Sequence, residues 1–409
     1  MGTEAGARAV LVAVTTLMVG FGLVTSVMGV RGTEEFSAPV AGLAGSVHYV
    51  GFLVGAVLVP RMISAVGHIR VYAVLASAAA VSVLVYPFLV LAPVWVGMRV
   101  IFGLCISGMY IVAESWLSAT STNRNRGRWL AVYLVTANVG VAVGQWVLSG
   151  TGGSGPLPFV VGSALMSVSL MPLALSGAPA PALPPRLVRP PVRTVLAVAP
   201  LGPLTSIASG IGVGLALTIG PTYGVVAGYS LDRIALMMAV GMLGGVLLQW
   251  PVGVASDRLP RRRVILAIAA GSTVVAAAGL VVPAASMLTL VVFGAFTALS
   301  FPLYSLAISH VNDEIDPRLR VPASAVLVMA YGLGSVIGPL IGGLAIHRLG
   351  PASFWVLLAA STALLPVLAV ALRAPLGRPP APAAGDRAGS ESGVSSGRVG
   401  HSPVRPEGS

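Results

Sequence analysis

Long apolar stretches that follow one another through most of the chain constrain its fold more than any other feature. Between residues 9 and 372, runs of about 20 mostly apolar residues alternate with short polar or Pro-containing links. A helix of that length crosses the hydrocarbon core of a bilayer with its backbone hydrogen bonds satisfied internally. The pattern therefore predicts an all-α integral membrane protein.

The composition points the same way. Hydrophobic residues make up 56% of the chain and charged residues 9%, whereas about a quarter of the residues in a soluble domain carry charge. We predict twelve transmembrane helices, with counts of eleven and thirteen left open because some boundaries depend on single prolines. The predicted spans are 9–30, 37–59, 70–90, 93–117, 128–150, 157–177, 194–222, 233–255, 264–284, 288–310, 322–346 and 352–372.

The distribution of arginine predicts the orientation, since Lys and Arg are retained on the cytoplasmic side of short loops. With both termini cytoplasmic, Arg31, Arg233 and Arg348 lie outside, Arg99 lies within a span, and the other 20 of 24 basic residues lie inside. The net charge of +12 is therefore interpreted as membrane topology and attraction to anionic lipid head groups, not nucleic-acid binding. The expected location is the cytoplasmic membrane.

Two segments interrupt the apolar pattern and divide the chain. Residues 178–193 are rich in proline, which predicts an extended connector, and residues 374–409 lack apolar periodicity, which predicts a disordered cytoplasmic tail. The remaining units are a six-helix bundle over residues 1–177 and a second over residues 194–373. We expect the first apolar run to be a retained helix, because it lacks a small-residue cleavage site.

The two halves share features at nearly constant offsets, which indicates duplication of a six-helix unit. A charged loop at 253–263 has a degraded copy 193 residues earlier, at 60–70. Gly140-x3-Gly144 in the fifth span precedes Gly334-x3-Gly338 in the eleventh by 194 residues. Coincidence among glycine-rich helices is the weaker explanation for two such features together.

At these residues the chain resembles the major facilitator superfamily of secondary transporters. The segment Gly253-x3-Asp257-Arg258-x2-Arg261-Arg262 matches the loop motif of that superfamily, with Pro260 where glycine is usual. Further stretches resemble the YcaD-type branch, namely Glu114-Ser115, the segment 123–128, Tyr133, Gly144-Gln145, Gln249-Trp250-Pro251 and Gly334-Ser335-x2-Gly338-Pro339. The resemblance implies two six-helix bundles that rock about a central cavity and give alternating access to a site near the midplane.

The charged loop is a candidate gate at the inner face. Asp257 can accept hydrogen bonds from arginine and from a helix N-terminus, and so hold the bundles together in the outward-facing state. We assign this role to Asp257 and Arg258, with Gly253, Arg261 and Arg262 in the same motif. For Arg261 and Arg262, a purely topological role is an equal alternative.

Of all residues in the predicted spans, Arg99 has the least favourable free energy of membrane insertion, roughly 2.5–3.5 kcal/mol at mid-span. It lies about 9 Å along the helix from Pro93, so it can serve the transport path or extend to the outer interface. In the resemblance it occupies the basic position of the fourth-span motif, which is associated with proton coupling or an anionic substrate. We favour the functional interpretation.

Other polar residues within the spans are candidates for coupling or for the substrate path. Glu114 is about 22 Å along the helix from Arg99, near Arg124, Arg126 and Arg128. A structural salt bridge there is the first interpretation and a proton carrier the second. The remaining candidates are His48, Tyr110, Gln145, Gln249 and Tyr304. With few fixed charges at this depth, we expect a small neutral, weakly acidic or lipophilic substrate.

Gly334, Gly338, Pro339 and Gly342 form a face of small residues in the eleventh span. They resemble a Gly-Pro motif that drug/proton antiporters carry in the fifth span, where this chain has Gln145 instead. We therefore interpret them as a helix-packing face with a proline bend.

The sequence gives no basis for an enzyme. No lysine-containing phosphate-binding loop, metal-ligand spacing or second cysteine beside Cys105 is present. We expect no cofactor, a proton gradient as energy source, and a monomer that binds a small molecule and membrane lipid. The predicted function is secondary active transport, with a sensor on a transporter fold as the alternative and a channel as a more remote one.

Overall fold

The computed structural model describes residues 2–120, 126–176, 192–284 and 286–371. Every regular element within these ranges is helical. The first half of the chain forms α1 (Gly2–Glu35), α2 (Ala38–Val66), α3 (His68–Phe88), α4 (Ala92–Thr120), α5 (Arg126–Thr151), α6 (Leu157–Val168) and α7 (Met171–Ala174). The second half forms α8 (Val192–Val198), α9 (Leu201–Gly214), the π-helix η1 (Leu215–Ile219), α10 (Gly220–Val226), α11 (Leu231–Leu247), α12 (Gln249–Arg258), α13 (Arg261–Ala278), α14 (Leu288–Ser300), α15 (Pro302–Glu314), the 3-10 helix η2 (Pro317–Leu319), α16 (Arg320–Leu349) and α17 (Ala352–Ala371).

Ten helical segments of the described ranges are long and apolar enough to cross a membrane, and each coincides with a predicted span. At the ninth and twelfth predicted spans lie α13, which begins with three arginines, and α17, whose apolar part Ala352–Val367 is shorter. The predicted tail at 374–409 lies outside the described residues. So does the predicted connector at 178–193, except that α8 already begins at Val192.

Several predicted spans contain a proline at the start of a helix or a change of helix type. Proline stands in the first turn of α6, α10 and α15, where its missing N–H costs no hydrogen bond. The seventh predicted span contains η1 between α9 and α10, and Gly220-Pro221 follows it. Single π-turns inside transmembrane helices frequently mark functional positions.

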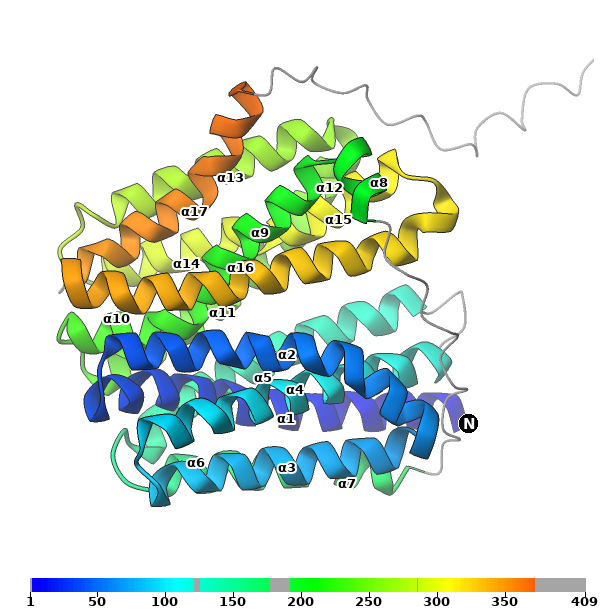
Figure 1. Ribbon diagram of the computed structural model, residues 1–409, viewed down its shortest axis with the longest axis vertical. Helices are drawn as coiled ribbons and strands as arrows, with labels where there is room; N and C mark the ends of the chain where they lie inside the picture. The colour runs from blue at the N-terminus through cyan, green and yellow to red at the C-terminus, as the bar shows by residue number, and fades with distance from the viewer. Residues whose placement is uncertain (1, 121–125, 177–191, 285, 372–409) are drawn as a thin grey trace, which may run out of the picture.

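The two halves of the chain lie side by side, with α1–α7 in the lower part of Figure 1 and α8–α17 largely above them. They meet where α2 packs along α16 and α5 packs along α11. Both pairs are related by the sequence repeat, since α11 begins 193 residues after α2 and α16 begins 194 residues after α5.

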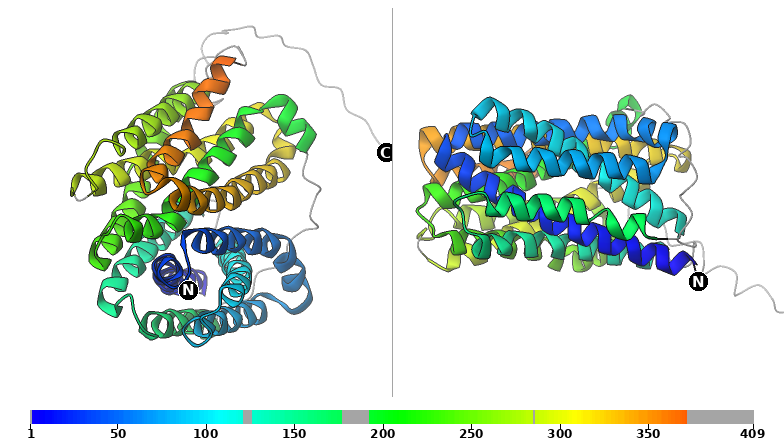
Figure 2. Two further views of the ribbon diagram at one scale, coloured as in Figure 1. Left: turned by 60° about the vertical axis from the view of Figure 1, so that its left-hand side comes forward. Right: turned by 90° about the horizontal axis from the view of Figure 1, so that it is seen from below.

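The bundle has two distinct ends. The N-terminus, α7, α8 and α12 lie at one of them (Figures 1 and 2), and so do the arginines that end α12 and begin α13. We call this the basic end. From the opposite end, α2 and α16 run side by side and then diverge toward the basic end (Figure 1).

Candidate functional site

Arg261 is the centre of the polar contacts in the charged loop. Its Nη2 lies 3.3 Å from Oδ1 of Asp257, and its Nη1 donates a hydrogen bond of 2.6 Å to Oγ of Ser256. Its Nε donates to Asp313 at the end of α15, which also makes an ion pair. The loop is therefore tied to α15 within the second half of the chain.

Within the described residues, the hydrogen bonds and ion pairs of Asp257 and Arg261 stay within the second half of the chain. Asp257 is 71% exposed and Arg258 is also exposed, and the ion pairs of Asp257 among the described residues go to Arg261. The clasp was predicted for the outward-facing state, so its role stays a prediction. Asp313 was missed, although an acidic pair at the end of the tenth span, facing a basic loop, is a usable sequence signal.

The two copies of the loop differ in backbone geometry. Gly67 ends α2 with φ of +87°, a conformation that favours glycine. Pro260, at the equivalent position of the second copy, has φ of −54° and begins α13. Replacement of glycine by proline thus changes how the chain enters the following helix.

The end opposite the basic end is sealed by direct contact between the halves. Gly42 of α2 lies so close to α16 that an added Cβ would meet the Pro339 carbonyl oxygen at 2.5 Å. An added Cβ at Gly45 would meet Cγ2 of Thr218 in η1 at 2.1 Å. Across the same interface, Thr33 Oγ1 donates a hydrogen bond of 3.0 Å to Thr222 Oγ1. We call this the closed end.

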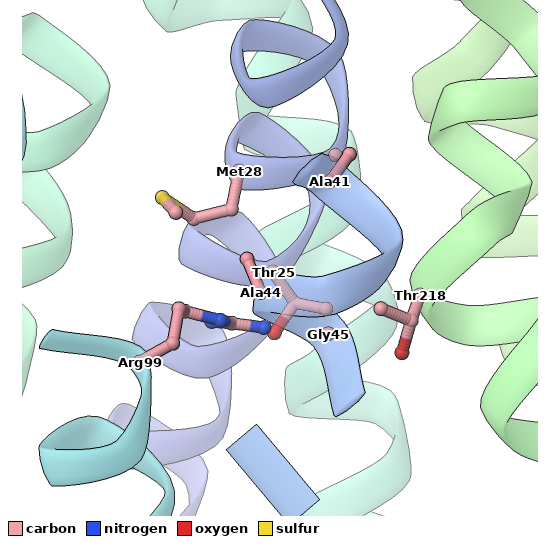
Figure 3. A pocket seen from close by; sticks show the side chains of 8 residues that line it. Thr25, Met28, Ala41, Ala44, Gly45, Arg99 and Thr218 are labelled. Atoms are coloured by element: carbon pink, nitrogen blue, oxygen red, sulfur yellow. The ribbon is translucent and has the colours of Figure 1, made fainter. Parts of the chain in front are cut away.

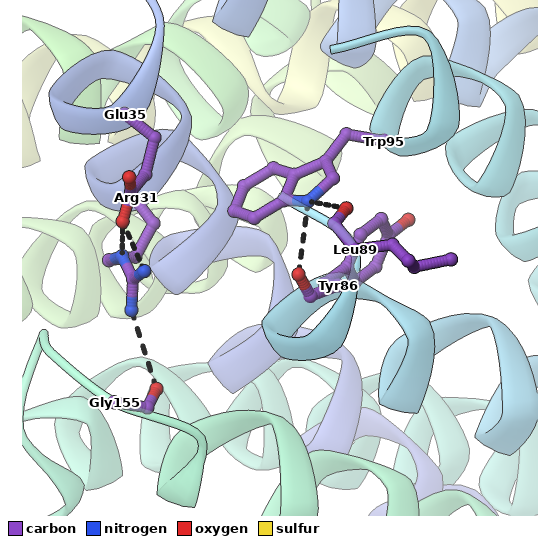
Figure 4. Close-up of polar contacts among 6 residues, drawn as sticks. All are labelled: Arg31, Glu35, Tyr86, Leu89, Trp95 and Gly155. Atoms are coloured by element: carbon purple, nitrogen blue, oxygen red, sulfur yellow. Dashed lines mark hydrogen bonds and ion pairs between the residues drawn. The ribbon is translucent and has the colours of Figure 1, made fainter. Parts of the chain in front are cut away.

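Local contacts also fix the connections at the closed end (Figure 4). Arg31 pairs with Glu35 one turn later and donates through Nη1 to the Gly155 carbonyl oxygen. Trp95 Nε1 donates hydrogen bonds of 3.1 Å to the carbonyl oxygens of Tyr86 and Leu89. The connections α1–α2, α3–α4 and α5–α6 are therefore anchored to the first half.

The glycine face of α16 packs against α9 and η1. At Gly334 an added Cβ would lie 2.2 Å from the Ile207 carbonyl oxygen, and at Gly342 it would lie 2.5 Å from Cδ2 of Leu215. Gly338 approaches Ile211 in the same way. In the first half, Gly140 and Gly144 of α5 make the equivalent approach to α1. Small residues allow these backbones to come into contact.

Arg99 turns into the protein rather than to the outer interface. Its side chain is 2% exposed, and Nε and Nη1 have no hydrogen-bond partner. The guanidinium carbon lies 5.5 Å from the centre of the Phe102 ring, a cation–π contact. The guanidinium lines a small pocket with Thr25 and Thr218 (Figure 3). In this conformation the side chain is buried among the helices and does not extend outward, and its role in transport stays a prediction.

His48 and Gln145 are buried near the centre of the first half. The His48 ring lies 5.8 Å from Phe21 and 5.7 Å from Phe102, centre to centre, and its Nδ1 has no partner. Gln145 is 1% exposed and its Oε1 is also unpartnered. Gln249, by contrast, is half-buried at the junction of α11 and α12.

Glu114 lies toward the basic end in a group of tyrosines. Tyr133 donates a hydrogen bond of 3.2 Å to its Oε1, and Tyr110 and Tyr304 are close enough to interact with its charge. The residue as a whole is exposed, whereas the hydrogen bond between its carboxylate and Tyr133 is partly buried. No ion pair of Glu114 occurs in the described part of the chain, and the side chains of Arg124 and Arg126 lie outside that part.

Tyrosines of both halves therefore flank this carboxylate. Tyr110 Oη contacts the sulfur of Met18 at 2.7 Å in the first half. In the second half, Tyr304 and Tyr331 have ring centres 4.9 Å apart. The pairing of Tyr331 with Tyr304 requires contact between α16 and α15 and has no local sequence signal.

The chain is similar in sequence to a large transporter family. The sequence model described as Major Facilitator Superfamily matches residues 6–314 and 202–406. An uncharacterized MFS-type transporter YcaD of Escherichia coli O139:H28 (strain E24377A / ETEC) is 28% identical over 313 residues, which cover 75% of this chain and 79% of the relative. A relative of Enterobacter sp. (strain 638), also an uncharacterized MFS-type transporter, is 28% identical over 312 residues, 73% of this chain and 77% of its own.

Solved transporter structures share the fold. The nucleoside transporter NupG superposes with a TM-score of 0.71 at 12% identity, covering 90% of this chain and 99% of its own. A D-xylose-proton symporter gives a TM-score of 0.67 at 13% identity, with 88% and 96% covered. At these identities the likeness concerns the fold alone.

Proposed function

We propose that this chain, which belongs to the major facilitator superfamily, carries a small solute across the membrane by alternating access, coupled to protons. The proposal includes twelve transmembrane helices, with α13 and α17 completing the set, both termini in the cytoplasm, and a monomer in the cytoplasmic membrane surrounded by lipid. The basic end then faces the cytoplasm, in keeping with retention of arginine on that side.

The observation that carries the proposal is the contrast between the two ends. At the closed end, Gly42 and Gly45 are in contact with Pro339 and Thr218 of the other half, so a solute has no space between them. Toward the basic end, α2 and α16 diverge and the residue Glu114 is exposed. This is the arrangement expected of an inward-facing state.

Glu114 is the side chain that best fits the role of proton carrier. A proton-coupled cycle needs a group that changes charge, and a carboxylate paired with arginine would be held ionised. Among the described residues, Glu114 instead accepts a hydrogen bond from the neutral Tyr133 hydroxyl. Tyr110 from α4 and Tyr304 from α15 approach it as neutral groups as well. The surroundings thus allow both charge states.

The test is solute-driven proton movement in proteoliposomes that enclose a pH-sensitive dye. A panel of solutes begins with nucleosides and pentoses, in view of the named substrates of NupG and the xylose symporter. If the protein is a proton-coupled transporter, one class of solute should change the pH inside the proteoliposomes, and an uncoupler should abolish this change.

Three other outcomes would contradict the proposal. Saturable solute binding without movement across the membrane would identify a sensor on a transporter fold. Solute flux that is indifferent to the proton gradient would remove the coupling, and a conductance without saturation would identify a channel.

A further inference from the structure

The small pocket at Arg99 lies between the two halves of the chain near the closed end (Figure 3). Thr25 and Met28 line it from α1, Ala44 from α2 and Arg99 from α4. Thr218 of η1 closes it from the second half. The pocket therefore exists only where the first-half helices and η1 are in contact.

The polar atoms at this pocket are donors that lack an acceptor. Nε and Nη1 of Arg99 and Oγ1 of Thr25 are buried and have no hydrogen-bond partner. The lining contains no acidic residue. The ion pairs of Arg31 and Arg261 within the described part of the chain do not include Arg99.

The unpartnered donors of Arg99 and Thr25 need a hydrogen-bond acceptor, and the positive charge of Arg99 needs a negative charge beside it. A guanidinium stays protonated in proteins, and a buried charge is strongly unfavourable unless an opposite charge and hydrogen bonds compensate it. A water molecule would accept the hydrogen bonds but leave the charge unbalanced. A bound anion supplies both the acceptor and the negative charge.

The dimensions of the pocket restrict that anion. The void has room for about one particle of the size of a water molecule. Met28 and Ala44 add apolar surface, which suits a small, singly charged ion better than a multiply charged one. Only the carboxylate group of a larger organic solute would fit in this void, because α2 packs against η1 and leaves no room there for the other atoms of the solute.

We propose that Arg99 and Thr25 bind a small inorganic monovalent anion of the halide type, with chloride as the representative ligand. The anion accepts hydrogen bonds from Arg99 Nε and Nη1 and from Thr25 Oγ1. Because Thr218 completes the wall by packing on Gly45, the anion stabilises the contact of the halves at the closed end. This site is independent of the solute and of proton coupling at Glu114.

The test is thermal unfolding of the purified protein in sodium chloride, bromide, acetate or gluconate at one ionic strength. Chloride and bromide should raise the Tm in a saturable manner, whereas acetate and gluconate should not. Thr25→Val removes one donor at nearly constant shape and should weaken the apparent halide affinity about tenfold, since a hydrogen bond to a charged group contributes on the order of that factor. Bromide should give an anomalous diffraction peak beside Arg99.

Thr16→Val is the matched control. The Thr16 hydroxyl, on the same helix, donates to the Val12 carbonyl oxygen and is remote from the pocket, so this variant should keep the halide response of the wild type. Arg99→Lys keeps the charge but loses the fork of donors, and its response should be weakened while its fold is retained.

Three results would overturn the proposal. A halide response of equal size and midpoint in Thr25→Val and in the wild type would show a general salt effect. Stabilisation by acetate without stabilisation by chloride would assign the pocket to the carboxylate of a solute. Absence of a halide response in the folded wild type would show that water alone fills the pocket.

Discussion

The Tyr133 hydroxyl donates a hydrogen bond of 3.2 Å to Oε1 of Glu114, which joins α5 to α4 toward the basic end. The bond stabilises the carboxylate without neutralising it, unlike the arginine pairs of the charged loop. It gives Glu114 a defined position and leaves its charge free to change during a transport cycle.

Replacement of Glu114 by glutamine should abolish proton-driven accumulation, because an amide cannot bind and release the proton. Exchange of labelled for unlabelled solute across the membrane should continue in this variant. Accumulation and exchange in proteoliposomes distinguish the two activities. Glu314→Gln, an exposed change at the same end of the bundle, is the control and should retain both. Accumulation by Glu114→Gln at the wild-type level would exclude it as the proton carrier.

Loss of the Tyr133 hydroxyl should have a smaller effect than loss of the carboxylate. Tyr133→Phe removes one hydrogen bond, which contributes about 0.5–1.5 kcal/mol, so the transport rate should fall by about twofold to just over tenfold. Tyr229→Phe, at the closed end, should leave the rate unchanged. If the two phenylalanine variants behave alike, the Tyr133–Glu114 contact is structural only.

Asp313 and Asp257 should differ in what their substitution affects. Arg261 binds both, but Asp313 connects the loop to α15, so Asp313→Asn should lower the stability of this conformation by about 0.2–1 kcal/mol, as for a partly exposed ion pair. Asp257→Asn should change stability less and slow transport, because its proposed partner lies in the other half. Thermal unfolding and initial transport rates measure the two effects, with Glu34→Gln as control. Equal transport rates for Asp257→Asn and the wild type would eliminate the gate.

The closed end should open when its glycine contact is lost. In Gly42→Val, the side chain would overlap the Pro339 carbonyl region and separate α2 from α16. A cysteine placed at Met28, in a chain whose Cys105 is replaced by serine, should then react faster with an impermeant thiol reagent from outside.

Gly97→Val is the control for this experiment, since an added Cβ there meets no atom within 4 Å. Both changes carry a similar helix-propensity effect, so a difference between them reports the contact. Equal labelling rates in the two variants would show that Gly42 does not seal the closed end.

Much of the fold could be predicted because each span is encoded locally. The apolar runs predicted the ten candidate spans, and the offset of the Gly140 and Gly334 motifs predicted an equivalence that reappears in the start positions of α5 and α16. Hydropathy was less informative for α13, whose first turn is three arginines.

The candidate site could be predicted only in part. The type of a residue shows how unfavourable its burial in the membrane is, but it does not show which residues it contacts. Arg99 was identified by the free-energy cost of placing an arginine in a membrane. The orientation of its side chain and its contact with Phe102 depend on packing between helices. The pairing of Arg261 with Asp313 joins residues 52 positions apart and has no periodic signal. The π-helix η1 places Thr218 against Gly45, and no characteristic amino-acid composition distinguishes it from the flanking α-helices.

The repeat-related contacts α2–α16 and α5–α11 have a further consequence. Under the offset of the repeat, α2 corresponds to α11 and α5 to α16, so each contact is the other with the two halves exchanged. That is the isologous interface of a twofold dimer. The chain thus has the contact geometry by which two identical six-helix units would associate. Its two loops depart from that symmetry, since Asp257, Arg258 and Arg261 stand where the first copy has Ser64, Ala65 and His68.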